Sequence, residues 1–192
     1  AGEVTTVSKI NTIADGTAVQ TPGDKLFPYL QANVDHVITV DDSELTLSFL
    51  DMAENHKMIV ENSGLLTVAA LKHLDFKGKK VVSVLSGGNM DVLTMATVVQ
   101  NGLMQRDRIF TVSVMLPDKP GQLAAVSSLI AKEQGNVIKL EHNVFANVNR
   151  TAGVELTITL ESFGTEHKDQ IIKALEAAGY CPVITKTNGI YM

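Results

Sequence analysis

The sequence lacks several features that would mark common protein classes. It has one cysteine, Cys181, so no disulfide can form within the chain, which suits a reducing compartment. No apolar run approaches the roughly 18 residues of a membrane-spanning helix, and no signal-peptide pattern opens the chain. We therefore expect a soluble, cytoplasmic protein.

An excess of positive charge is also missing. The 16 basic and 21 acidic residues among 192 give a net charge of −5. A general binder of nucleic acids or of membrane surfaces needs a basic face, so we expect neither partner. Because 45% of the residues are apolar, the chain can bury a core, and disorder over its whole length is excluded.

Signatures of metal sites and of nucleophilic catalysis are absent as well. None of the histidines has a metal-ligand spacing to Cys181 or to a pair of carboxylates, so no metal site is predicted. They are interpreted as surface or structural residues: His36, His56, His73, His142 and His167. No nucleophile elbow and no Ser/His/Asp order occurs.

The charge distribution divides the chain near residue 107. Residues 1–107 hold thirteen acidic and eight basic residues, whereas residues 108–192 hold eight of each. At roughly 100–200 residues per domain, the length allows two small domains. We predict one domain over residues 1–107 and a second over residues 108–192.

The first part predicts strands alternating with helices, which is typical of a parallel α/β sheet. Three short runs rich in β-branched residues are expected as strands, at 37–40, 58–60 and 80–85. Three helices are expected: one N-capped by Asp42 or Ser43, one from Ser63 to Leu74, and one N-capped by Asp91 or Asn89 that runs to a C-cap at Asn101-Gly102. With so few strands, this part is expected to belong to a larger domain.

The second part predicts the order β-α-β-β-α-β, the ferredoxin-like arrangement. Apolar residues alternate at 110–116 and 154–161, recur at helical spacing at 123–130 and 171–178, and favour further strands at 136–148 and 183–185. Such a fold has an antiparallel sheet with its helices on one face. The other face is then left for a partner or a ligand.

Polar motifs follow the predicted strands of the first part. The Ser86-Gly87-Gly88-Asn89 motif comes between a strand and a helix, where phosphates and ring heteroatoms are often held. A plain strand-to-helix turn is an equally good interpretation. For Asp15 and Glu61, the residues alone favour a solvated loop carboxylate and a capping residue.

Three motifs, in this order and spacing, resemble the back half of the catalytic domain of threonine ammonia-lyase, a fold-type II enzyme dependent on pyridoxal phosphate. They are Thr12–Gly16, Glu61–Gly64 and Ser86–Asp91. Downstream, Asp118–Gly121 and Gly135-Asn136 resemble an ACT domain, an amino-acid-sensing regulatory module. The resemblance implies a partial three-layer, parallel-sheet pyridoxal-phosphate domain followed by a ferredoxin-like βαββαβ ACT domain.

The resemblance also implies a site in each part. Ser86 would hydrogen-bond the pyridine nitrogen of the cofactor, and the other cofactor-binding residues would be Gly87, Asn89, Gly16, Asp15 and Glu61. The effector pocket, commonly at an interface between two ACT domains, would be lined by Asp118, Pro120, Gly121, Gln122 and Asn136. Isoleucine as inhibitor and valine as its antagonist are the effectors that the resemblance implies.

The sequence departs from the family at the catalytic lysine. The family forms its Schiff base through a lysine in a Ser-x-Lys-x-Arg-Gly-Ala string, which this sequence lacks. The Gly-rich phosphate loop and the Asn-bearing substrate loop are missing too. We expect a C-terminal fragment with no catalytic residue of its own, which holds no cofactor alone and catalyses no elimination.

Three functions stay open on this evidence. The chain is part of a threonine ammonia-lyase that converts L-threonine to 2-oxobutanoate and ammonia, in isoleucine biosynthesis or threonine catabolism. Alternatively, it is an amino-acid-binding regulatory module, or part of a serine dehydratase or serine racemase, which are not expected to carry the ACT tail. The expected partners are an amino-acid effector, a second copy bound through the ACT domain, and the missing N-terminal half of the enzyme.

Overall fold

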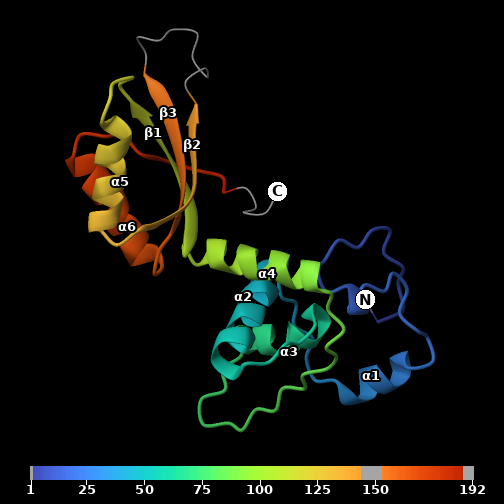
Figure 1. The fold of residues 1–192 in the computed structure, drawn as a ribbon. Coiled ribbons are helices and arrows are strands. Elements are labelled where there is room, and N and C mark those ends of the chain that lie inside the picture. Colours follow the sequence, from blue (N-terminus) through green and yellow to red (C-terminus); the bar gives the residue numbers. More distant parts are fainter. Residues whose placement is uncertain (1, 144–152, 188–192) are drawn as a thin grey trace. The chain divides into compact units, whose positions relative to one another are not determined.

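The computed structural model describes residues 2–143 and 153–187 of the chain. The chain falls into two compact units, Ala1–Gly102 and Leu103–Met192 (Figure 1). Helix α4 (Val92–Gln105) crosses this division, and the boundary predicted from the charge distribution lies just beyond its end. Among the described helices, none is long and apolar enough to cross a membrane.

The first unit is helical. Its other α-helices are α1 (Phe27–Asn33), α2 (Asp42–Asp51) and α3 (Leu66–Ala69), and shorter 3-10 or π turns cover Asp15–Thr17, Met52–His56, Asn62–Leu65 and Ala70–His73. The single helix predicted from Ser63 to Leu74 is therefore three short helical turns in sequence. The core of this unit forms where the apolar stripe of α2 meets α3 and α4, around Leu45, Phe49, Leu65, Ala69 and Val98.

Helix α2 begins one residue earlier than the sequence predicted. Its N-cap is Asp41, which forms a capping box with Glu44: the Asp41 N–H donates to Glu44 Oε2 at 2.9 Å. This backbone hydrogen bond is the main cause of the lowered pKa of Glu44. Asp42 is not the cap. Its carboxylate instead accepts hydrogen bonds from Thr12 Oγ1 (2.6 Å) and from the Ile13 N–H (3.0 Å).

The runs predicted as parallel strands are unpaired in the described part of the first unit. A strand needs neighbours that take up its backbone N–H and C=O groups. Here one backbone bond, from the Glu61 N–H to the Gly87 carbonyl oxygen (3.4 Å), links the ends of the second and third runs. Apolar side chains in the runs stay exposed, with Val37 at 87% and Val82 at 88%. These are the side chains that a parallel sheet would bury.

Gly102 is not the C-cap that the sequence predicted, because α4 continues to Gln105. Gly102 is buried in the helix, and a Cβ on it would make an ordinary contact of 3.4 Å with the Cβ of Leu50. After the helix, Asp107 adopts the left-handed conformation (φ 53°), which turns the chain into the next strand.

The second unit has the predicted ferredoxin-like order. It consists of β1 (Ile109–Leu116), α5 (Gln122–Lys132), β2 (Asn136–Asn143), β3 (Val154–Glu161), α6 (Thr165–Ala177) and β4 (Val183–Thr185). The strands form one antiparallel sheet in the order β2-β3-β1-β4. Both helices cover the same face (Figure 1) and bury a core with the alternate residues of β1 and β3. Residues 144–148, which were predicted as the end of the strand at 136–148, lie outside the described residues.

Asp107 joins the start of the second unit to its last helix. Its carboxylate accepts Thr165 Oγ1 (2.8 Å) and pairs with Lys168 Nζ (2.8 Å), and its carbonyl oxygen accepts the Ser162 hydroxyl. Burial of Asp107 opposes its ionisation. The hydrogen bonds from Lys168 and Thr165, with the Lys168 charge, outweigh burial and hold the pKa of Asp107 below its ordinary value.

We expect Asp107→Asn to destabilise the second unit by about 1 kcal/mol at pH 7, since it removes a charge-assisted pair. A lowered pKa gives stability that is fully present above the unfolded-state value of about 3.9 and is lost as the pH falls through the folded-state value. The difference between wild type and variant should therefore persist from pH 7 to about 5 and shrink below about 4. Hydrogen exchange of α6 measures it, with the exposed Asp169→Asn as control. A difference that is independent of pH would contradict the assignment.

Candidate functional site

Segments that are far apart in the sequence meet in the first unit. Asn62 Nδ2 donates to the Ile13 carbonyl oxygen (3.0 Å), which ties the turn at 61–64 to the segment at 12–16. The Glu61 carboxylate accepts the Asn89 N–H through Oε2 at 3.1 Å, which ties the same turn to the segment at 86–91. The structure thus brings together the three motifs that hold the predicted cofactor-binding residues.

Glu61 fills the inner side of the turn at Gly87. Gly87 has a positive φ of 77°, and a Cβ placed on it would lie 2.2 Å from Glu61 Cδ. Only glycine leaves this space free, and glycine adopts this backbone conformation without strain. Glu61 therefore braces the turn: its carboxylate occupies the space beside Gly87 and accepts the hydrogen bond from the Asn89 N–H.

A cavity of about 420 Å³ opens beside this turn. Among the predicted cofactor-binding residues, Asp15, Glu61 and Asn89 line it, together with hydroxyls and amides of α2 and α4 such as Thr46, Thr94 and Asn101. Ser86, Gly16 and Gly87 do not line it. A Cβ on Gly16 would lie 2.9 Å from Ser63 Oγ, and the exposed Ser86 has its carbonyl oxygen against Gly64.

The lining of this cavity is acidic. It includes the carboxylates of Asp15, Glu61 and Asp91, and none of the described lining residues is a lysine or an arginine. Asp91 caps α4 by accepting the Leu93 and Thr94 N–H groups (2.9 Å each). The Thr94 hydroxyl is the main cause of its lowered pKa, followed by the Thr94 backbone N–H. Asp91 was one of the two caps that the sequence predicted for this helix.

Asn62 is a site residue for which no role was predicted from the sequence. It is 4% exposed, and its Oδ1 has no hydrogen-bond partner in the described part of the chain, as is also true of Ser63 Oγ. A buried acceptor of this kind normally has a donor. The motif Glu61–Gly64 was visible in the sequence, but burial of its second residue was not.

The second candidate site lies where β1 ends and α5 begins. A cavity of about 320 Å³ is lined by Leu116, Pro117, Asp118, Lys119, Pro120, Gly121, Gln122, Leu123 and His142. Four of the predicted effector residues are thus brought together by one continuous turn. Gly121, with a φ of 90°, is the N-cap of α5, and no side chain caps this helix. The Gln122 N–H donates to the Lys119 carbonyl oxygen (3.4 Å), whereas the next two first-turn N–H groups of α5, those of Leu123 and Ala124, are open to a ligand.

Two residues change the predicted composition of this site. Asn136 lies at the other end of the sheet, because it pairs with Glu161, which in turn pairs with Ile109 at the start of β1, whereas the cavity lies at the end of β1. The Asn136 side chain donates to Glu161 Oε2 at 3.0 Å. A cavity within one chain therefore does not include it. His142 was interpreted as a surface or structural residue, yet it lines the cavity from β2. The strand register places it there, and the spacing of histidines along the sequence does not reveal that register.

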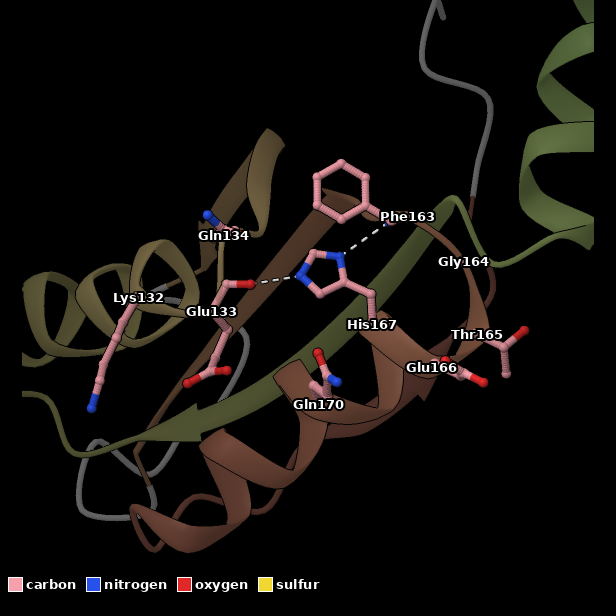
Figure 2. A pocket seen from close by; sticks show the side chains of 9 residues that line it. All are labelled: Lys132, Glu133, Gln134, Phe163, Gly164, Thr165, Glu166, His167 and Gln170. Carbon is pink, nitrogen blue, oxygen red and sulfur yellow. Dashed lines mark hydrogen bonds between the residues drawn. The ribbon is translucent and has the colours of Figure 1, made fainter. Parts of the chain in front are cut away.

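A third cavity, of about 610 Å³, lies between the end of α5 and the start of α6. Figure 2 shows His167 at its centre, between Phe163 and Glu133. Nδ1 of His167 accepts the Phe163 N–H (3.0 Å), so Nε2 carries the proton and donates to the Glu133 carbonyl oxygen (2.6 Å). The Phe163 ring stacks on the imidazole at 4.8 Å. Both ring nitrogens are used, so this histidine is structural.

We expect His167→Ala to destabilise the second unit by about 1–3 kcal/mol, because it leaves the Phe163 N–H and the Glu133 carbonyl without their partner. Urea unfolding measures the loss. The matched control is Gln170→Ala, an exposed residue that lines the same cavity on the same helix. Equal stability of the two variants would show that the histidine bridge contributes nothing.

Comparison with known families assigns both units. The family described as "Pyridoxal-phosphate dependent enzyme" matches residues 1–87, and the ACT domain family matches residues 110–179. The chain joins part of a pyridoxal-phosphate-dependent enzyme domain to an ACT domain. The resemblance drawn from the sequence motifs is therefore confirmed.

Curated relatives match across the two units. The L-threonine ammonia-lyase of Geobacter sulfurreducens is 36% identical over 188 residues, 96% of this chain and 46% of that protein. The L-threonine ammonia-lyase of Thermotoga maritima is 34% identical over 170 residues, 88% of this chain and 42% of that protein. A biosynthetic L-threonine dehydratase, IlvA, of Staphylococcus aureus is 30% identical over 142 residues, which are 73% of this chain and 34% of that protein. The chain spans less than half the length of these relatives.

Proposed function

We propose that this chain is the regulatory C-terminal portion of an L-threonine ammonia-lyase, and that its ACT unit binds an amino-acid effector at the turn between β1 and α5. One observation carries the proposal: four of the predicted effector residues line a single cavity in the unit that matches the ACT family. The relatives named L-threonine ammonia-lyase support the activity of the longer enzyme, and a relative named biosynthetic supports a biosynthetic role.

The chemistry of the cavity fits a free amino acid. Asp118 offers a negative charge for an α-ammonium group, and the open N–H groups at the start of α5 favour a carboxylate. The side chains of Leu116 and Leu123 supply an apolar wall for an aliphatic side chain. This combination favours a branched-chain amino acid over a highly charged ligand.

We infer that two copies of the chain associate through β2. This strand is one edge of the sheet, and it exposes Val137 and Leu140, which an unprotected edge strand in solution avoids. Antiparallel pairing of β2 with the β2 of a second copy would bring Asn136 towards the far end of the other strand, near the other copy's cavity. Asn136 would then serve as an effector residue across the interface, which accounts for its place in the predicted set.

The first unit offers a partner for the ring nitrogen of pyridoxal phosphate, but none for its phosphate or its covalent bond among the described residues that line the cavity. The Gly87 turn presents an exposed Ser86, whose hydroxyl suits a ring nitrogen. The acidic cavity beside it offers no cationic partner for the phosphate and no lysine for the covalent bond among its described lining residues. When bound by the longer enzyme, the cofactor supplies the electron sink for bond breaking at the amino acid. We propose that this chain alone holds no cofactor, and that the remaining contacts come from the N-terminal half.

We place the protein in the cytoplasm. The support is the free and exposed thiol of Cys181, which persists in a reducing compartment, together with relatives named as biosynthetic enzymes.

Calorimetric titration of the chain with L-isoleucine, L-valine and L-threonine tests the effector proposal. We expect saturable binding of a branched-chain amino acid, weakened about tenfold or more by Asp118→Asn, which removes the charge for the ammonium group. Asp169→Asn, an exposed acidic residue of the same unit, is the control and should bind as wild type does. If the wild-type chain binds none of the three amino acids, the effector proposal fails.

A further inference from the structure

His142 reaches the effector cavity from a different strand than the other residues that line it. In the sheet, His142 opposes Leu156, a fully buried residue on the helix-covered face. Its neighbour Glu141 opposes Thr157 on the other face. Because side chains alternate along a strand, the imidazole lies on the side of α5. The other lining residues belong to the single stretch Leu116–Leu123.

The imidazole of His142 is also free to bind a ligand. Within the described residues, neither of its ring nitrogens has a hydrogen-bond partner, whereas both nitrogens of His167 are used. His73 likewise pairs with Glu44. The exposed His142 thus combines an unused donor with a position in the wall of a cavity.

A zwitterionic ligand needs complementary groups on two sides of the cavity. The charged lining side chains are Asp118 and Lys119, both from the turn, and the imidazole faces them from β2. Since Asp118 matches the α-ammonium group, a donor across the cavity can bind the α-carboxylate together with the open N–H groups of α5. A charge-assisted hydrogen bond from an imidazole to a carboxylate is among the stronger polar contacts available.

We propose that His142 binds the α-carboxylate of the effector and so makes the cavity selective for free amino acids. The inference rests on the proposed function of the ACT unit and adds a residue to it. A ligand without the carboxylate, such as an amino-acid amide, keeps its ammonium contact with Asp118 and its apolar contacts but has no charge for His142 to bind. Selectivity for the acid over its amide is therefore the property that His142 controls.

The test compares L-isoleucine with L-isoleucinamide by calorimetric titration of wild type, His142→Leu and His142→Gln. In the wild type, the free acid should bind at least about tenfold more tightly than the amide. In His142→Leu, affinity for the acid should fall by about tenfold while affinity for the amide stays unchanged, and His142→Gln should lie between them. Because His142 is exposed on an edge strand, both variants should fold, and circular dichroism checks this.

The arms of the experiment separate the two proposals. His36→Gln, an exposed histidine of the first unit, is the matched control and should leave both affinities unchanged. If the His142 variants keep the wild-type preference for the acid while Asp118→Asn loses binding, the effector site stands and the role of His142 is overturned. If the wild-type chain binds neither probe, the effector site and the role of His142 both fail.

Discussion

Gly64→Ala is expected to destabilise the first unit by more than about 3 kcal/mol, at the upper end of overpacking effects. The residue is buried, and a Cβ placed on it would lie 2.0 Å from the Ser86 carbonyl oxygen and 2.9 Å from Val60 Cγ1. The first contact is with backbone, so no side-chain rotation relieves it. The turns at 61–64 and 86–89 would have to separate.

Hydrogen exchange followed by mass spectrometry measures this separation directly. Gly64→Ala should raise exchange in the two turns and lower the midpoint of thermal unfolding. The control is Gly23→Ala, where a Cβ meets nothing within 4 Å. Because the second unit has a core of its own, its exchange should stay at the wild-type level. Equal behaviour of the two alanine variants would show that the turns are not packed as described.

The second unit could be predicted in detail from the sequence because its signals are local. The alternation of Val112 and Val114 with Thr111 and Ser113 indicates which face the helices cover, although the two hydroxyl residues are buried as well. The strand pairing follows from the order of the elements. The half-buried Gln122 opens α5 close to where the Pro-Gly turn predicted it. Local patterns are enough when each strand lies beside a partner that is also visible in the sequence.

The first unit was predicted less well because strand formation depends on partners. The runs at 37–40, 58–60 and 80–85 have the composition of buried strands, but in the described residues they lack neighbours to pair with. Helix positions depend on local caps, so the predicted starts of the helices lay close to the observed ones, although Asp41 and not Asp42 caps α2. The glycine at 102 shows the limit of a local rule: it is buried within α4, which continues to Gln105, and does not end the helix.

The candidate sites needed tertiary information of two kinds. That Glu61 and Gly87 belong to one cofactor-binding set was implied only by the family resemblance, and their direct contact is visible only in the structure, since no local spacing brings residues so far apart together. That His142 faces the effector cavity follows from strand register, in which a shift by one residue would turn it to the other face. The histidines therefore looked equivalent in sequence, although His167 is structural and His142 is open to a ligand.

Gly87→Ala is expected to destabilise the turn beneath the proposed cofactor edge by about 2–4 kcal/mol. One part of the cost is the positive φ of 77°, which alanine adopts only with strain. The other part is the Cβ contact of 2.2 Å with Glu61 Cδ, which forces the carboxylate away from the Asn89 N–H. Gly88→Ala is the matched control, because its Cβ would meet only the Ile59 carbonyl oxygen at 3.8 Å.

A double-mutant cycle separates the two parts. Glu61→Ala removes the group that Gly87→Ala displaces, so in that background the alanine at 87 should cost only the backbone strain. The interaction free energy between the two positions should then be about 1–2 kcal/mol. Urea unfolding gives the free energies, and hydrogen exchange at Asn89 reports whether its N–H has lost the carboxylate. Strictly additive costs would mean that Glu61 does not brace the turn, and that Gly87 is required for its backbone conformation alone.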